Sequence, residues 1–227
     1  DKHNGRTDQQ QGQPEAGPRV ILIDKPGAIQ TALRVGRIVP DGRDPVNFDL
    51  EVLNSVFGGG FTARINSNLR EEKGWTYGAG SGISSAIGPQ TFQISTSVQT
   101  DKTAAALAEI VKELNGITES RPVTPQELEL VRRGDVLTLA DRYETNNAMV
   151  GYLRYVDRFD HPVNWIETLP DRYASLTPGQ VTEVSSLLDP EAMTWVIVGD
   201  LSQIEDEVRA LNLGPVEVRA PDGSIVR

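Results

Sequence analysis

Arg70 and Tyr77 are the two residues of this sequence whose types and spacing could act together on a substrate. Arginine offers a rigid fork of N–H donors, and tyrosine offers a single phenolic O–H. If both tips emerge at one place, such donors can hold peptide carbonyls or an oxyanion. From the residues alone, the alternative is that Arg70 is a surface cation and Tyr77 a half-buried aromatic side chain of a strand.

Other catalytic chemistries have little support in the sequence. The only histidines are His3 and His161, and neither lies in a set of ligands spaced for zinc. Carboxylates near His161 could hold a metal in principle, but a solvated helix end explains them as well, so no metal site is predicted in this chain. The chain has no cysteine, which excludes disulfides, thiolate metal sites and cysteine nucleophiles. A Gly-x-Ser-x-Gly motif is also absent.

The elements expected around the pair form a hinge, a helix, a stop and a strand. A helix over residues 45–56 ends at Gly58-Gly59-Gly60, which permit backbone angles that other residues avoid. No phosphate loop is predicted there, because a helix precedes the glycines and no Lys-Ser/Thr follows. A second helix is expected over 62–73, and Gly74 suits the left-handed position after its end. A strand from Trp75 to Ser84 follows, which brings the arginine at the helix end towards the tyrosine.

The remaining pattern predicts helices and strands that are segregated along the chain. Strands are expected at 20–23, 30–36, 91–100, 194–200 and 215–219, and helices at 101–114, 125–141, 144–160, 177–188 and 201–211. The first two strands are expected to pair as a hairpin, and Asp101 to cap the helix that it begins. Capping boxes beginning at Thr124 and Thr177 should start two of the helices. This order favours an α+β fold, a mostly antiparallel sheet with helices packed on one face.

Length and composition describe a globular chain with a polar start. The chain has 227 residues, of which 38% are hydrophobic and 24% charged. Residues 1–18 are rich in Gln, Gly and Pro and are expected to form a disordered linker, with one domain over 19–227. Because the chain begins without Met, we interpret it as a processed or excised fragment. The net charge of −10 and the lack of basic clusters argue against nucleic acid, and no apolar run reaches the roughly 20 residues of a membrane span.

Several separated positions resemble one family signature. They are Leu53-Asn54, Gly58-Gly59-Gly60, Arg64, Leu69-Arg70-Glu71-Glu72-Lys73-Gly74 and Tyr77. This spacing resembles insulinase/pitrilysin-type zinc peptidases and mitochondrial-processing-peptidase-like proteins, specifically their non-catalytic domain. The resemblance covers roughly residues 19–213, and Asp200 after the Val-Ile-Val-Gly run also fits.

The resemblance implies a function that needs a partner. In such proteins two similar halves close around a chamber; one carries His-x-x-Glu-His and zinc, and the other supplies an Arg and a Tyr seven positions apart. It implies that Arg70 binds a backbone carbonyl of a peptide substrate and that Tyr77 hydrogen-bonds the scissile carbonyl or its oxyanion. The zinc motif is missing here. The expected Zn²⁺ therefore belongs to a partner half or subunit, and this chain is expected to be inactive alone.

Two other functions remain open at this point. Some mitochondrial-processing-like relatives are scaffold subunits that cleave nothing; in such a protein Gly74 would stop the helix, Tyr77 would pack on the sheet and Arg70 would pair with a nearby Glu. A peptide-binding module could instead add a peptide strand to an exposed sheet edge. By analogy with exported bacterial relatives, a periplasmic or secreted location is favoured over the cytoplasm.

Overall fold

Six strands form one sheet in the computed structural model, which describes residues 18–139 and 143–227. The strands are β1 (Arg19–Asp24), β2 (Gln30–Asp41), β3 (Thr76–Ile83), β4 (Pro89–Gln99), β5 (Thr194–Gly199) and β6 (Val216–Arg219). Their order across the sheet is β3-β4-β2-β5-β1-β6. The neighbours β3, β4, β2 and β5 pair antiparallel, whereas β1 pairs parallel with both β5 and β6. The predicted α+β class and mostly antiparallel sheet are confirmed.

The predicted hairpin between the first two strands is wrong. β5 lies between them, pairing parallel with β1 and antiparallel with β2. β1 and β5 are both near-continuous apolar runs, and such strands gain most when they have backbone partners on both sides and a covered face. Because β1 and β2 are close in the sequence, a hairpin between them is favoured. The more apolar β5, although distant in the sequence, supplies hydrogen-bonding partners to both strands at once. The expected edge strand near the C-terminus is β6.

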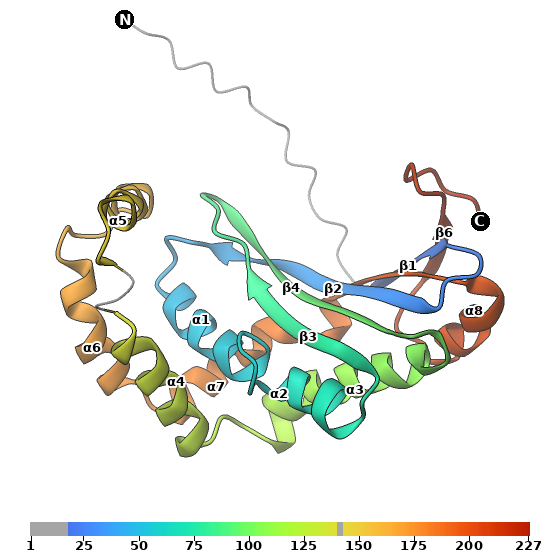
Figure 1. Ribbon diagram of the computed structural model, residues 1–227, viewed down its shortest axis with the longest axis horizontal. Coiled ribbons are helices and arrows are strands. Elements are labelled where there is room, and N and C mark those ends of the chain that lie inside the picture. Colours follow the sequence, from blue (N-terminus) through green and yellow to red (C-terminus); the bar gives the residue numbers. More distant parts are fainter. Residues whose placement is uncertain (1–17, 140–142) are drawn as a thin grey trace, which may run out of the picture.

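The helices lie on one face of the sheet, as predicted. Figure 1 shows α1, α2, α3 and α7 beneath the strands, while the opposite face of the sheet carries no helix layer. The α-helices are α1 (Val46–Phe57), α2 (Arg64–Asn66), α3 (Thr103–Asn115), α4 (Pro125–Leu137), α5 (Asn146–Arg158), α6 (Trp165–Ser175), α7 (Pro178–Glu183) and α8 (Leu201–Ala210). The shorter turns are the π-helical η1 (Ser67–Glu72) and η3 (Gly116–Ser120) and the 3₁₀ turns η2 (Thr100–Lys102), η5 (Val184–Leu188) and η6 (Pro190–Ala192).

Local signals explain where several helices begin. The side chains of Thr124 and Thr177 accept hydrogen bonds from the backbone N–H three residues later, which confirms both capping boxes. Asp101 does not cap α3, because it lies inside the 3₁₀ turn η2 and α3 begins only at Thr103. The sequence pattern missed α6, which contains Pro170 and buries none of its residues. A proline within a weakly apolar run hides a helix from periodicity.

Other boundaries shift by a few residues. The helix expected over 62–73 begins at Arg64 and is π-helical from Ser67, and the one over 177–188 is split between α7 and η5. Except for Pro18, the expected linker lies outside the described residues. In the described ranges no helix is long and apolar enough to cross a membrane.

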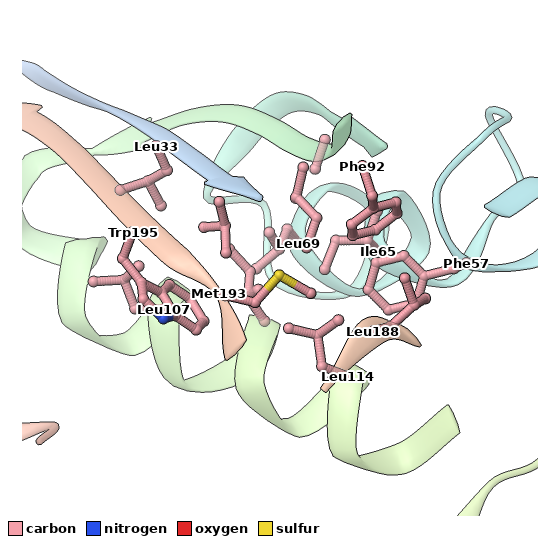
Figure 2. Close-up of a cluster of buried hydrophobic side chains, with 14 of the residues drawn as sticks. Leu33, Phe57, Ile65, Leu69, Phe92, Leu107, Leu114, Leu188, Met193 and Trp195 are labelled. Carbon is pink, nitrogen blue, oxygen red and sulfur yellow. The ribbon is translucent and has the colours of Figure 1, made fainter. Parts of the chain in front are cut away.

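The core fills the space between the sheet and the helices beneath it. In Figure 2, Leu33, Phe92 and Trp195 from the sheet meet Phe57, Leu69, Leu107 and Leu114 from the helices. These side chains are fully buried, with 0% exposure each. Each such burial stabilises the fold by roughly 1.5–3 kcal/mol relative to exposure. Because Leu69 sits in this core, the turn that carries its neighbour Arg70 is fixed to the sheet.

Candidate functional site

The predicted pair lies on either side of the turn that leads into β3. Arg70 is in η1, where wider i to i+5 hydrogen bonds such as Lys73 N–H to Asn68 O (3.1 Å) replace α-helical ones. π-helical turns are uncommon and are found frequently at functional sites. Gly74 then takes the left-handed conformation, with φ of 66°. Its predicted role as the helix stop is confirmed.

Tyr77 sits on a β-bulge. The register of β3 against β4 passes from Thr76 opposite Val98 to Ala79 opposite Thr96, so β3 carries one extra residue here. Two hydroxyls hold the bulge: the Gly78 N–H donates to Thr76 Oγ1 (3.1 Å), and Thr96 Oγ1 donates to Gly78 O (2.9 Å). Bulges commonly re-aim a side chain next to a functional site.

The bulge sends the Tyr77 side chain into solvent. Tyr77 is 90% exposed, and its hydroxyl has no hydrogen-bond partner among the described residues. A half-buried, packed tyrosine is therefore ruled out at this position, and so is the sheet-packing role that the scaffold alternative assigned to it.

Arg70 is held by two contacts of its guanidinium group and keeps most of its N–H donors available. Its guanidinium carbon lies 4.5 Å from the centroid of the Phe61 ring, and its Nε is 3.4 Å from Glu71 Oε1. Both members of that ion pair are exposed, and such pairs contribute little to stability. Within the described residues no hydrogen bond or ring contact joins Arg70 to Tyr77. The pair thus presents two separate donors, one on each side of the same turn.

The other polar residues of this stretch are used internally. Arg64 makes a bidentate ion pair with Glu127, with Nε–Oε1 and Nη2–Oε2 distances of 2.7 Å. The Asn66 side chain donates to Phe61 O (2.7 Å) and accepts from the Ala79 N–H (3.0 Å), which ties α2 to β3. Sequence reasoning missed Asn66 as a positioning residue. The signal for this role in the sequence was a polar residue directly after the apolar Ile65, on the helix that packs against the sheet.

The glycine triplet combines close packing with one unusual backbone conformation: Gly58, at φ −158° and ψ 5°, lies outside the helical and extended regions, as predicted for this position. None of Gly58, Gly59 and Gly60 has a positive φ. Gly58 O accepts the Ser81 N–H (2.8 Å), and a Cβ at Gly58 would lie 2.3 Å from Ser81 Oγ. A Cβ at Gly59 would lie 2.9 Å from the Ser55 Cα, whereas one at Gly60 would meet nothing within 4 Å. Gly58 therefore lets the end of α1 touch β3.

A shallow groove runs from Tyr77 along β3 and β4. One hollow of about 240 Å³ is lined by residues that include Arg34, Tyr77 and Ser95. A second of about 430 Å³ shares Ser95 and continues past Gly80 and Gly82. Because glycine has no side chain, the groove stays open at these positions. Its walls are mostly Gly, Ser and Thr and expose more apolar than polar surface, and they leave room for an extended peptide with the tyrosine at one end.

Both edges of the sheet are covered by the chain itself. On β3, the outward N–H groups of Ala79 and Ser81 are bound by Asn66 Oδ1 and Gly58 O. On β6, Val218 donates to Arg227 O (2.8 Å) and accepts from the Val226 N–H (2.8 Å). Covered edges cannot take another strand at these positions. The peptide-binding alternative that relied on an exposed edge is therefore restricted to edge positions other than these.

No metal centre is formed by the described parts of the chain, where no group of three or more His, Cys, Asp or Glu could hold an ion. His161 instead stacks on Trp165, with ring centroids 3.8 Å apart and planes 2° apart. Burial lowers the pKa of His161, and the positive charge of Arg172 lowers it further. This histidine is accordingly neutral at neutral pH and part of an aromatic stack.

Comparisons with known proteins agree with the fold. Residues 2–134 match the family described as the peptidase M16 inactive domain. A peptidase M16 inactive domain from Pseudomonas fluorescens superposes with a TM-score of 0.72 at 23% identity, covering 81% of this chain and 44% of that one. The inactive peptidase domain of a putative zinc protease from Bordetella parapertussis gives 0.64 at 14% identity, covering 75% and 92%. The periplasmic protease PqqL from Escherichia coli gives 0.63 at 12%, covering 81% and 20%.

These structural matches establish the fold. This chain spans only 44% of the length of the Pseudomonas fluorescens chain. A search of curated proteins found no match.

Proposed function

This chain belongs to the peptidase M16 inactive-domain family, and from that premise we propose that it is the substrate-binding, non-zinc half of a zinc metalloendopeptidase. It closes over a peptide together with a zinc-bearing homologous half, on the same polypeptide or another. In the proposed complex Arg70 and Tyr77 contact the substrate, and Gly58, Gly59, Gly60 and Gly74 hold the elements that carry them.

One observation carries this proposal. Among the polar residues of the family-like stretch, Arg64 and Asn66 are consumed by internal contacts. Tyr77 is raised on a bulge, 90% exposed, with no internal partner for its hydroxyl in the described structure. A β-bulge leaves one residue without a partner on the neighbouring strand, and an exposed aromatic ring buries no surface in the core. Such a feature is best explained by a ligand that approaches from outside the chain.

In the proposed complex, different residues of this chain would contact different parts of the substrate around the scissile bond. A zinc ion in the partner half would polarise the carbonyl and activate water. The Tyr77 hydroxyl would donate to the oxygen on which negative charge develops, and the Arg70 fork would hold a neighbouring backbone carbonyl. The groove along Gly80, Gly82 and Ser95 would keep the peptide extended. Positioning of this kind lowers the barrier by holding the reacting groups in place.

The location of the protein is proposed by analogy. One structural match is described as a periplasmic protease, and a periplasmic or secreted location is consistent with a sequence without cysteine. Immunoblotting of cell fractions would test it, and recovery in the cytosolic fraction alone would contradict it.

The test of function is Tyr77→Phe in the chain combined with its zinc-bearing half. Loss of one oxyanion donor should lower kcat by about 10²–10³. The thermal unfolding midpoint should not change, because the hydroxyl has no partner in the described fold. Arg70→Met should weaken substrate use and raise KM, since it removes a contact to the peptide backbone.

The matched control is Tyr152→Phe, because Tyr152 is 5% exposed and its hydroxyl is bound internally. It should lower stability and leave kcat near the wild-type value at temperatures where the fold persists. Wild-type kcat in Tyr77→Phe would rule out the proposed role.

A further inference from the structure

A pocket of about 450 Å³ lies away from the Tyr77 groove, between the start of α1 and the helices α5 and α6. Its walls are largely aromatic and come from segments far apart in the sequence. A volume of this size falls in the range of small-ligand sites. None of Arg70, Tyr77 or the groove residues lines it.

A column of stacked groups crosses the pocket. His161 covers one face of the Trp165 ring at a centroid distance of 3.8 Å. The guanidinium of Arg172 must therefore lie over the other face, where its Cζ is 4.2 Å from the Trp165 centroid. The same Cζ is 4.4 Å from the centroid of Phe48, which meets Tyr173 edge-on at 5.1 Å. Two aromatic rings thus contact one guanidinium.

Arg172 has no carboxylate in direct contact among the described residues, although its positive charge opposes the burial that raises the pKa of Asp49. No hydrogen bond or ion pair of its side chain occurs within the described residues. Arg43 is already engaged with Asp41 and Asp160, at 3.5 Å each. Asp44 accepts the Val46 N–H (3.0 Å) at the start of α1. The Phe48 and Trp165 rings lie against the Arg172 guanidinium without accepting hydrogen bonds from it. Its N–H groups therefore remain for a ligand, and their fork matches a carboxylate.

Glu51 adds an acceptor to the same pocket. Its carboxylate receives one hydrogen bond, from Asn47 Nδ2 (3.1 Å), and has further lone pairs to offer. Burial raises the pKa of Glu51, while the hydrogen bond from Asn47 opposes that rise. Tyr155 lies close to both charges, and burial together with Glu51 raises its pKa to about 12. The pocket therefore combines a donor fork, an acceptor and aromatic walls.

We propose that this pocket binds the C-terminal residue of a peptide, with Arg172 holding the terminal carboxylate, Glu51 accepting the terminal amide N–H, and the rings enclosing a large apolar side chain. A simple carboxylic acid would satisfy Arg172 but leave Glu51 without a donor. An acidic side chain inside a peptide would carry no apolar group beside its carboxylate. The proposal goes beyond the contacts of Arg70 and Tyr77 and does not depend on a zinc-bearing partner.

Fluorescence anisotropy on the full 227-residue chain tests the proposal with an N-terminally labelled Gly-Ser-Gly-Ser-Gly-Phe peptide. The free acid should bind at least about tenfold more tightly than the C-terminal amide, as expected for loss of a charge-assisted hydrogen bond. An amide peptide with an internal Glu should bind like the plain amide. In competition, N-acetylphenylalanine should be stronger than 3-phenylpropionate, which lacks the amide N–H.

Two variants test whether Arg172 is the residue that binds the terminal carboxylate. Arg172→Gln should weaken free-acid binding by about tenfold or more. The matched control Arg158→Gln should bind like wild type, since Arg158 also contacts an aromatic ring, Phe159 (5.6 Å), but does not line the pocket. Circular dichroism checks folding, and the peptide comparisons on the unaltered chain stand if Arg172→Gln misfolds.

Three results would overturn the assignment. They are equal binding of acid and amide, equal competition by 3-phenylpropionate, and no binding at millimolar peptide. Because the assay contains no zinc half, its failure would leave the proposed peptidase function untouched, and loss of that function would leave this site standing.

Discussion

At the scale of single residues, two tyrosines differ in whether their hydroxyl groups are bound within the fold. The hydroxyl of Tyr77 has no described partner, while that of Tyr152 donates to Val163 O (2.6 Å) and accepts from the Ile166 N–H (3.0 Å). We predict that Tyr152→Phe lowers the free energy of unfolding by about 0.5–1.5 kcal/mol, because it removes two hydrogen bonds of a buried tyrosine to part-buried backbone groups. Urea denaturation measures this. An unchanged midpoint would show that water replaces the hydroxyl without cost.

Gly58 and Gly60 form a second contrast. A Cβ at Gly58 would lie 2.7 Å from the Ser81 backbone N, and one at Gly60 would meet open space. Gly58→Ala should destabilise the fold by about 1–3 kcal/mol through overpacking. Gly60→Ala should change it by less than about 0.5 kcal/mol. Thermal unfolding of the two variants tests this difference. Equal losses of stability would mean that the close contact between α1 and β3 does not explain why glycine is required at position 58.

The sequence identified some parts of the site better than others. Gly74 could be placed because a helix end requires a left-handed residue, which is a local property. The exposure of Tyr77 could not, since it depends on a bulge held by Thr76 and Thr96, and Thr96 belongs to another strand. Whether Arg70 and Tyr77 contact substrate remains a proposal.

At the scale of elements, Asp200 shows how one side chain joins three segments. Its carboxylate caps α8 through the Ser202 N–H (3.2 Å), receives the Gly27 N–H (3.0 Å) from the β1–β2 turn, and binds Gln203 Nε2 (2.7 Å). These hydrogen bonds, led by that from the Ser202 side chain, lower the pKa of Asp200.

Because the folded protein holds Asp200 at a lowered pKa, its contribution to stability is present above the ordinary Asp pKa and is lost as the pH falls through the folded value. We predict that Asp200→Asn lowers the urea midpoint at pH 7. The difference from wild type should shrink below about pH 4, where aspartate normally protonates. The control Asp206→Asn, on the exposed side of α8, should change neither quantity. A difference that persists at low pH would refute the electrostatic explanation.

The helices and the sheet were predictable to different degrees. Capping boxes at Thr124 and Thr177 are short-range signals, and both helices begin where those signals indicate. The hairpin failed because strand order is decided by pairing between distant segments. α6 escaped notice because Pro170 interrupts its pattern.

At the scale of the whole molecule, the proposed enzyme needs two halves. The described residues contain no group that could hold a metal. We predict that this chain alone cleaves no peptide and that adding the zinc-bearing half produces cleavage of a quenched fluorescent substrate. A chelator should abolish that cleavage and zinc should restore it, while the unfolding temperature of this chain alone stays constant. Chelator-sensitive hydrolysis by the isolated chain would contradict the division of roles.

The central place of β5 has a consequence for biosynthesis. Arg19 pairs with Thr194, and β5 also completes the pairing of β2. At about 5–20 residues per second, the ribosome delivers β5 roughly ten to thirty-five seconds after β1. During that interval the Val-Ile-Leu-Ile run of β1 has no neighbour from β5 or β6 and is a natural target for chaperones. A nascent chain that stalls before Thr194 therefore exposes its most apolar early strand with no sheet to receive it.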